Sequence, residues 1–359
     1  MVKLICDMPL LEINNLRLDF LAGNESLRAV DGASLSIEAG ETVCLVGESG
    51  CGKSVTALSI ARLVPTPPAR YSGGEILLNG RDVLKMSQTE LCDIRGRVVS
   101  YVFQEPGASL NPVFRVGAQI KESLKLHRRD LSGRAGSPLH AARSQTSRSA
   151  HLATTGRPTS NEFNAEVIRL LKLVGIPAPE SRIKDYPFQM SGGMQQRVMI
   201  AMALASEPKL LVADEPTTAL DVTIQAQILD LLHDLKQRLG MAILLITHNL
   251  GIVGDMADRV AVMYAGQIVE LSPARELLRR PLHPYTRALM ASVPKLSGGA
   301  ARLTAIPGNV PHIGNFPPGC RFAPRCPMAK PECSNAIPEL VEVEPQRWVR
   351  CPFWNGQKV

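Results

Sequence analysis

Residues 47–54, GESGCGKS, have the composition of a loop that binds phosphate groups. Glycines at positions 50 and 52 allow main-chain N–H groups to turn toward phosphate oxygens, and a helix that starts where the loop ends adds its positive end. The ammonium group of Lys53 is expected to reach the outer phosphates of a nucleoside triphosphate, and the hydroxyl of Ser54 to ligate Mg²⁺. The predicted nucleotide-binding residues of this loop are Gly47, Glu48, Ser49, Gly50, Cys51, Gly52, Lys53 and Ser54.

Two acidic residues follow a second apolar stretch, KLLVADEP, at residues 209–216. Asp214 is placed at the carboxyl end of a buried strand, where it can hold Mg²⁺ through the water shell of the metal. Glu215, one residue later, could polarise an attacking water molecule. Adjacent carboxylates at a strand end often form only a solvated turn, but beside a complete phosphate-binding loop they favour hydrolysis of a nucleoside triphosphate.

A second candidate phosphate site lies at residues 190–197, MSGGMQQR, directly before the apolar run VMIAMALA. A serine and two glycines at the start of a helix offer a hydroxyl, exposed N–H groups and a helix dipole to an anion. Because the chain already has a phosphate-binding loop, a second anion site predicts that two chains enclose each nucleotide between them.

These motifs, in this order, resemble those of the ATP-binding subunit of an ABC transporter. Residues 190–194 are similar to the signature Leu-Ser-Gly-Gly-Gln of that family, with methionine in place of both the leucine and the glutamine. The resemblance implies that Ser191, Gly192 and Gly193 contact ATP held by the opposite subunit. Met194 lacks the amide of the family's glutamine, so the contact of that amide with ribose is not carried over.

Further roles come from the same resemblance. Gln104 in VFQEP resembles the glutamine that contacts Mg²⁺ and the attacking water, and His248 in LLITHNL resembles the switch histidine near the γ-phosphate. Asp221 in TALD resembles the loop that bridges the two subunits. Phe20 corresponds to the aromatic that stacks on adenine, with a core phenylalanine of an edge strand as the alternative. The resemblance thus implies the catalytic residues Glu215, as general base, His248 and Gln104, and the Mg²⁺ ligands Ser54, Gln104 and Asp214.

The order of the expected elements indicates an α/β fold, and the resemblance implies the P-loop nucleoside triphosphatase type with a RecA-like core. Strands and helices alternate from residue 209 to residue 270, which is the pattern of a parallel sheet covered by helices. Asn79-Gly80, after an apolar triplet, predicts a hairpin in a small antiparallel β-subdomain. Apolar residues at 167, 170, 171 and 174 recur at helical spacing within a helical subdomain expected over about 105–205. We expect the nucleotide-binding domain to span residues 10–270.

The formal net charge of +7 is concentrated in one tract and is not spread over the chain. Residues 128–160 are rich in Ser, Arg, Ala, Gly and Thr and have few large apolar side chains, so they are predicted to form a disordered insertion. A basic arm that binds anionic lipid or a partner is the alternative. No run of eighteen apolar residues occurs, and the first residues lack the apolar core of a signal peptide. We therefore expect the chain to stay cytoplasmic, and the resemblance implies a peripheral protein at the cytoplasmic face of the inner membrane.

Residues 271–359 are expected to form a C-terminal extension. The stretches HPYTRALMASVP and GCRFAPRCP resemble the extension of the ATPases of oligopeptide, dipeptide and nickel importers. A late group of thiols in a reducing compartment favours metal ligation over disulfide bonds, and the resemblance implies a [4Fe-4S] cluster. Zinc and unligated thiols stay open as alternatives. The four residues concerned are Cys320, Cys326, Cys333 and Cys351.

The motifs and the resemblance together imply an ATPase with ATP and Mg²⁺ as its ligands, and the resemblance implies that it powers uptake of peptides or a related small solute. The resemblance implies a second ATPase subunit (a copy or a sister chain), two integral membrane permeases and, indirectly, a solute-binding protein. The alternative is a soluble ABC ATPase that acts on nucleic acid or ribosomes. Such proteins usually carry two nucleotide domains or a long coiled coil, neither of which occurs in this sequence, and no nucleic-acid partner is expected.

Overall fold

The computed structural model describes residues 8–127, 159–218, 220–292 and 305–355, which form two compact units. The first unit draws its described residues from Met1–Ile94, Val212–Glu215 and Leu235–Val359, and the second from Arg95–Leu211 and Pro216–Asp234. The predicted insertion lies outside the described residues up to position 158. Thr159 and Ser160, which the prediction placed in the insertion, instead begin a helix.

The first unit holds most of the strands. Its elements are β1 (Leu11–Ala22), β2 (Glu25–Ile37), β3 (Thr42–Val46), α1 (Lys53–Ser59), β4 (Ala69–Leu78), β5 (Arg81–Asp82), α2 (Gln88–Ile94), the end of β7 (Leu210–Asp214), β8 (Ala242–Thr247), α10 (Val253–Met256), β9 (Arg259–Tyr264), β10 (Gln267–Pro273), α11 (Ala274–Arg279), α12 (Pro284–Ala291), β11 (Val341–Glu344) and β12 (Arg347–Val349). Short 3-10 turns lie at Val83–Lys85, Leu250–Ile252, Ala323–Arg325 and Pro331–Ser334.

The main sheet of this unit has the strand order β11-β12-β10-β9-β3-β8-β7. β3 pairs in parallel with β8 and β9, and every residue of β3 and β8 is buried. Strands covered on both faces need continuous apolar runs, which ETVCLV and AILLIT supply. The carboxyl ends of β3 and β8 point to one edge of the sheet, so the residues that follow them gather there.

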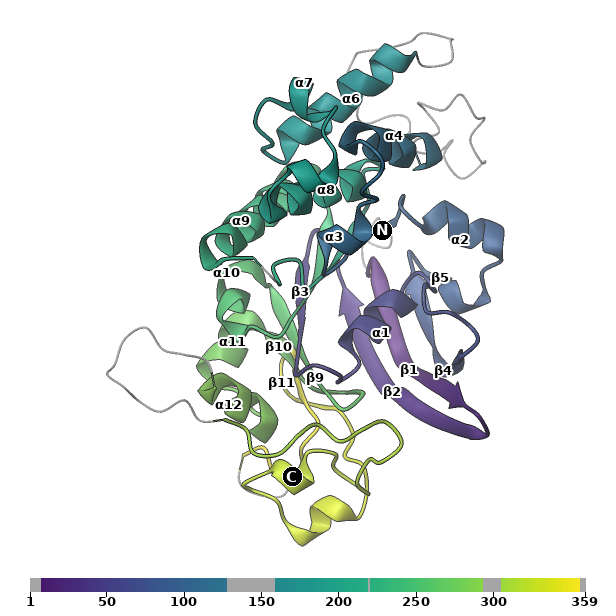
Figure 1. The fold of residues 1–359 in the computed structure, drawn as a ribbon. Helices are drawn as coiled ribbons and strands as arrows, with labels where there is room; N and C mark the ends of the chain where they lie inside the picture. Colours follow the sequence, from purple (N-terminus) through teal and green to yellow (C-terminus); the bar gives the residue numbers. More distant parts are fainter. Residues whose placement is uncertain (1–7, 128–158, 219, 293–304, 356–359) are drawn as a thin grey trace, which may run out of the picture. The chain divides into compact units, whose positions relative to one another are not determined.

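A second, antiparallel sheet has the order β2-β1-β4-β5 (Figure 1). The predicted Asn79-Gly80 turn joins β4 to β5, with Leu78 paired to Arg81. Asn79 and Gly80 have φ values of 49° and 74°. Two consecutive positive φ values are typical of the tight hairpin turn that favours Asn-Gly. The structure thus confirms both the hairpin and the small antiparallel subdomain.

The end of the chain adds strands to the main sheet. β12 pairs antiparallel with β10, and β11 pairs with β12. Phe322, which is 1% exposed, packs against Tyr264 of β9 and Tyr285 of α12, with ring centroids 5.3 Å apart in both pairs. These contacts join the C-terminal residues to the core of the first unit.

The second unit is mainly helical (Figure 1). Its elements are β6 (Val99–Val102), α3 (Pro106–Ser109), α4 (Val116–His127), α6 (Ser160–Leu173), α7 (Pro179–Arg182), a 3-10 turn (Pro187–Gln189), α8 (Gly192–Leu204) and most of α9 (Val222–Leu239). Thr159 and Glu162 form a capping box at the start of α6. The predicted apolar positions of α6 are buried: Val167, Leu170, Leu171 and Val174 are at most 1% exposed. The α/β fold class with antiparallel and helical parts is confirmed.

Among the described residues, no helix has both the length and the apolar character needed to span a membrane.

Two neighbouring glycines at the start of α8 differ in the space around them. A Cβ atom at Gly193 would lie 2.8 Å from Cγ2 of Ile224, whereas one at Gly192 would meet Cδ2 of Leu220 at an ordinary 3.5 Å. We expect Gly193→Ala to lower the free energy of unfolding by about 1 kcal/mol, because the branched Ile224 side chain must shift. Gly192→Ala, the matched control, is expected to be neutral or stabilising. Equal effects of the two substitutions in denaturant unfolding would contradict this explanation.

Candidate nucleotide-binding site

The loop at residues 47–54 connects β3 to α1 and packs closely on neighbouring backbone. A Cβ atom at Gly47 would lie 2.2 Å from the main-chain oxygen of Met263, so only glycine fits there. Gly52 has a φ of 104°, and a Cβ at this position would lie 3.1 Å from the Ala29 carbonyl oxygen. These restrictions explain two of the glycines by packing and backbone conformation.

Lys53 lies inside this loop with only 5% of its surface exposed. Its Nζ donates hydrogen bonds to the carbonyl oxygens of Gly47, at 2.8 Å, and of Glu48, at 3.0 Å. A buried ammonium group needs such partners. The loop therefore presents a fixed positive charge, which is what a phosphate group requires.

Asp214 and Ser54 come together at the carboxyl edge of the sheet. The Ser54 hydroxyl donates a hydrogen bond to the Asp214 carboxylate. Burial raises the pKa of Asp214 above its ordinary value, and the negative charge of Glu215 acts in the same direction, while Ser54 and Lys53 oppose it. A hard cation such as Mg²⁺ prefers oxygen ligands of this kind, so the pair fits the predicted metal site.

Glu215 and His248 form a second pair at the same edge. His248 Nδ1 lies 3.2 Å from Glu215 Oε2, and the Glu215 side chain is 14% exposed against 56% for His248. Glu215 has a φ of 47°, an uncommon value for a residue other than glycine, and its N–H donates to the Ile246 carbonyl at 3.0 Å. This sharp turn after β7 directs the carboxylate toward the histidine, which follows β8. The first unit thus brings Lys53, Ser54, Asp214, Glu215 and His248 to one edge.

The signature residues lie in the second unit. Ser191 is the N-cap of α8, and its hydroxyl accepts a hydrogen bond from the Met194 N–H at 3.4 Å. Asp221 caps α9 in a similar way, because its carboxylate accepts from the Ile224 N–H at 2.9 Å. Gly193 contacts this same isoleucine, so the starts of α8 and α9 pack together. Their predicted contacts with a second chain stay predictions.

Two further predicted site residues, Gln104 and Phe20, lie in different units. Gln104 follows β6 in the second unit and is exposed. Phe20 is a half-buried residue of β1, paired with Leu27 of β2 and Ala69 of β4. Contact of Gln104 with Mg²⁺ and stacking of Phe20 on adenine therefore stay predictions.

The four late cysteines line one cavity of about 690 Å³, together with side chains such as His283, Phe322 and Trp354. Burial raises the pKa of the Cys320 and Cys326 thiols, and raises that of Cys351 to about 11. Across the described ranges, no three His, Cys, Asp or Glu side chains are grouped so that they could hold a metal ion. The arrangement does not support the [4Fe-4S] cluster that the resemblance implies, or the zinc site that stayed open as an alternative.

The sequence analysis did not predict three side chains that form hydrogen bonds with the phosphate-binding loop or with the backbone before Ser191. Arg325 pairs with the carboxylate of Glu48, and the Tyr285 hydroxyl accepts from the Glu48 N–H at 2.9 Å. In the second unit, Gln195 Nε2 donates to the carbonyl oxygens of Pro187 and Met190 and so fixes the backbone before Ser191. Arg325 and Tyr285 fall within GCRFAPRCP and HPYTRALMASVP, but no local spacing indicates that they contact a loop so far away in the sequence.

Two family models match the chain. The model described as "ABC transporter" matches residues 30–218. The model described as "Oligopeptide/dipeptide transporter, C-terminal region" matches residues 269–333.

Curated relatives align over nearly the whole length. The Oligopeptide transport ATP-binding protein AppD of Bacillus subtilis (strain 168) is 46% identical over 342 residues, which cover 95% of this chain and 96% of the relative. The Probable peptide ABC transporter ATP-binding protein y4tR of Sinorhizobium fredii is 45% identical, with 98% of this chain and 96% of the relative covered. A solved structure described as the dimeric post-hydrolysis state of the ATP-binding cassette MJ0796 bound to ADP and Pi is similar, with a TM-score of 0.58 and 25% identity. It covers 74% of this chain and 99% of that chain.

A parallel sheet with a glycine-rich loop after β3 and the Asp214-Glu215 pair after β7 defines a P-loop nucleoside triphosphatase. The family model and the relatives carry the identification further. The chain belongs to the ABC transporter family as an ATP-binding protein, and its enzymatic activity is ATP hydrolysis.

We expect Asp214→Asn to raise the melting temperature of the nucleotide-free protein by about 1–3 °C. The folded-state pKa is raised, so the folded protein binds this proton more tightly than the unfolded chain does, and the ionised carboxylate costs stability above the folded pKa. The same substitution should lower Mg²⁺-dependent ATP hydrolysis about 100-fold, because the predicted Mg²⁺ ligand loses its charge. Calorimetry and a phosphate-release assay measure the two effects. A lower melting temperature would contradict the electrostatic account.

Proposed function

We propose that this chain hydrolyses ATP between two ATPase subunits and thereby powers uptake of peptides through separate membrane permeases. The observation that carries the proposal is the C-terminal match at residues 269–333 to the oligopeptide/dipeptide transporter model. The same chain carries the phosphate-binding loop, with the functional side chains gathered at one edge of the sheet. The relatives at 44–46% identity are named as oligopeptide or peptide import ATP-binding proteins. Nickel or another small solute is the second candidate substrate class.

Each residue of the edge has a proposed part in the reaction. Lys53 binds the outer phosphates, and Glu215 orients and deprotonates the attacking water as general base, with His248 holding the Glu215 carboxylate and facing the γ-phosphate. Ser54 and Asp214, with Gln104, hold Mg²⁺. The metal, when bound, would stabilise the negative charge on the phosphate oxygens.

The opposite side of the nucleotide is proposed to come from another ATPase subunit. Ser191, Gly192 and Gly193 of one subunit contact the γ-phosphate bound to the other, and Asp221 lies at the contact between subunits. The dimeric state named for the similar MJ0796 cassette supports this arrangement. The second subunit is a copy of this chain or a sister chain.

The domain boundaries and the location belong to the same proposal. Residues 10–270 form the nucleotide-binding domain and residues 271–359 the importer-type extension. The chain works as a peripheral protein at the cytoplasmic face of the membrane, attached to two permeases that receive solute from a binding protein. The alternative of a soluble ABC ATPase acting on nucleic acid or ribosomes is not favoured, because the relatives are named for transport.

The [4Fe-4S] cluster is a separate hypothesis. Four thiols line one cavity, but no three His, Cys, Asp or Glu side chains among the described residues are grouped so that they could hold a metal ion, which favours unligated cysteines. Anaerobic purification tests the point. Iron and acid-labile sulfide recovered in equal amounts, near four of each per chain, would support a cluster; protein that carries neither would remove it.

We expect Glu215→Gln to lower the turnover number for ATP about 10²–10⁴-fold while ATP affinity stays within about threefold, because the amide keeps the shape but cannot accept the proton. A phosphate-release assay measures the turnover number, and equilibrium binding of ATP measures the affinity. The matched control is Glu38→Gln, an exposed glutamate at the end of β2 that should retain full turnover. Undiminished turnover by Glu215→Gln would refute the assignment of the base.

The transport proposal is tested by isolating the chain from its native membrane with whatever binds it. We expect two hydrophobic permeases to co-purify, and peptide with its binding protein to stimulate ATP hydrolysis by the reconstituted complex. Recovery with RNA that is lost at high salt, and no permease, would favour the nucleic-acid alternative instead.

A further inference from the structure

Glu48, the acidic residue of the phosphate-binding loop, is held by a side chain of the C-terminal extension. Arg325 donates from Nη1 to Glu48 Oε2 at 2.6 Å and from Nη2 to Oε1 at 3.0 Å. The Arg325 side chain is 6% exposed and the Glu48 side chain 28%. A bidentate pair with this little exposure is specific in geometry and only weakly screened by salt.

Other contacts fix the guanidinium group in place. Nη1 donates to the Tyr264 hydroxyl at 3.3 Å, and Nε donates to the Pro307 carbonyl oxygen at 2.8 Å. The Gly308 carbonyl oxygen accepts from Nη2 at 3.2 Å. The hydrogen bond with Glu48 raises the pKa of Arg325, so the group stays charged. Arg325 is therefore a fixed positive charge beside the loop.

The extension also contacts the backbone of Glu48. The Glu48 N–H donates to the Tyr285 hydroxyl at 2.9 Å, and the Tyr285 ring lies 4.6 Å from that of Tyr264. The carbonyl oxygen of Glu48 in turn accepts from Lys53 Nζ at 3.0 Å. A single residue thus connects the extension to the lysine that binds phosphate.

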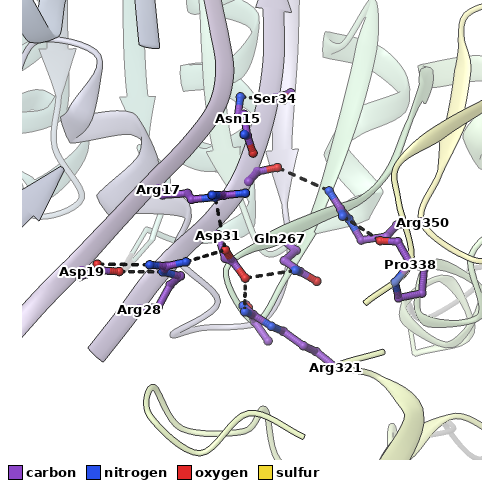
Figure 2. Close-up of polar contacts among 12 residues, drawn as sticks. Asn15, Arg17, Asp19, Arg28, Asp31, Ser34, Gln267, Arg321, Pro338 and Arg350 are labelled. Carbon is purple, nitrogen blue, oxygen red and sulfur yellow. Dashed lines mark hydrogen bonds and ion pairs between the residues drawn. The ribbon is translucent and has the colours of Figure 1, made fainter. Parts of the chain in front are cut away.

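A second connection begins four residues earlier in the extension, at Arg321. Figure 2 shows Asp31 of β2 among the guanidinium groups of Arg17, Arg28 and Arg321. Arg321 Nη2 lies 2.5 Å from Asp31 Oδ2, and Nη1 donates to the Ala265 carbonyl oxygen. The N–H of the next residue, Gly266, donates to the Cys51 carbonyl oxygen at 2.8 Å. The segment 321–325 therefore supports the loop at two points.

We propose that Arg325 is a positioning residue for ATP, which neutralises Glu48 and holds the phosphate-binding loop ready for the triphosphate. This inference rests on the proposed function of the loop. Without Arg325, the carboxylate of Glu48 would offset the charge of Lys53 and repel the phosphates. If Arg325 has this role, the C-terminal extension helps to set the affinity for ATP, in addition to completing the fold of the first unit.

The opposite charges of Arg325 and Glu48 predict the direction in which substitutions change the affinity for nucleotide. We expect Arg325→Ala to weaken equilibrium binding of the non-hydrolysable analogue AMP-PNP with Mg²⁺ about tenfold at low salt, and the loss to shrink as salt is raised. Glu48→Gln introduced into Arg325→Ala should restore affinity to within about threefold of wild type, because the unpaired charge is gone. Arg325→Lys should retain most of the affinity. Isothermal titration of the full chain measures all four proteins.

The matched control is Arg280→Ala, which removes another arginine–glutamate pair of the extension, with Glu344, that does not involve the loop. Its affinity should stay within twofold. Arg325→Ala with wild-type affinity, or a double variant as weak as Arg325→Ala, would overturn the proposal. Arg325→Met, which keeps the apolar stem, replaces Arg325→Ala if that variant fails to fold. Lys53→Ala separates the proposed function from the positioning role. If Lys53→Ala binds AMP-PNP with wild-type affinity, the proposed function fails. If Lys53→Ala loses binding while Arg325→Ala keeps wild-type affinity, only the positioning role is refuted.

Discussion

The need to neutralise a triphosphate determines how this molecule is organised. A loop can hold several negative charges only if positive groups and N–H donors surround them, and this chain buries Lys53 within the loop to begin that task. Burial of the ammonium is in turn possible because Gly47 and Glu48 supply carbonyl oxygens and Gly47 packs directly on the backbone at Met263. The Ser54-Asp214 pair is the proposed site of a divalent cation, which would contribute further positive charge.

This requirement also explains features that cost stability. Asp214 is a half-buried carboxylate beside Glu215, and Glu215 adopts a left-handed backbone conformation after β7. Neither arrangement favours the ligand-free fold, and under the proposed mechanism binding of cation and nucleotide offsets the cost of both. The C-terminal extension, in contrast, stabilises the ligand-free fold. Its aromatic residues around Phe322 and its paired arginines stiffen the turn at Gly266 and the loop at Glu48, so the nucleotide site rests on residues from both ends of the sequence.

Local patterns allowed much of this to be predicted. The strand before the loop, the Asn79-Gly80 hairpin and the buried face of α6 follow from short stretches, because backbone conformation and apolar periodicity are local properties. The pair Glu215 and His248 was predicted by resemblance, and the structure brings the two together. Contacts between distant segments could not be predicted in this way. Arg325 and Glu48 are far apart in the chain, and cysteine spacing did not reveal whether the thiols approach as metal ligands, which the structure does not support.

The central claim is that one nucleotide is shared by two ATPase subunits. A structure of the assembled transporter, trapped with ATP by Glu215→Gln, measures it directly through the distance from Ser191 Oγ to the γ-phosphate bound by the opposite subunit. We predict a hydrogen-bond distance of about 3 Å, with Lys53 Nζ of the opposite subunit on the same phosphate. A closed assembly in which Ser191 lies far from any nucleotide, while Lys53 still binds ATP, would contradict the account.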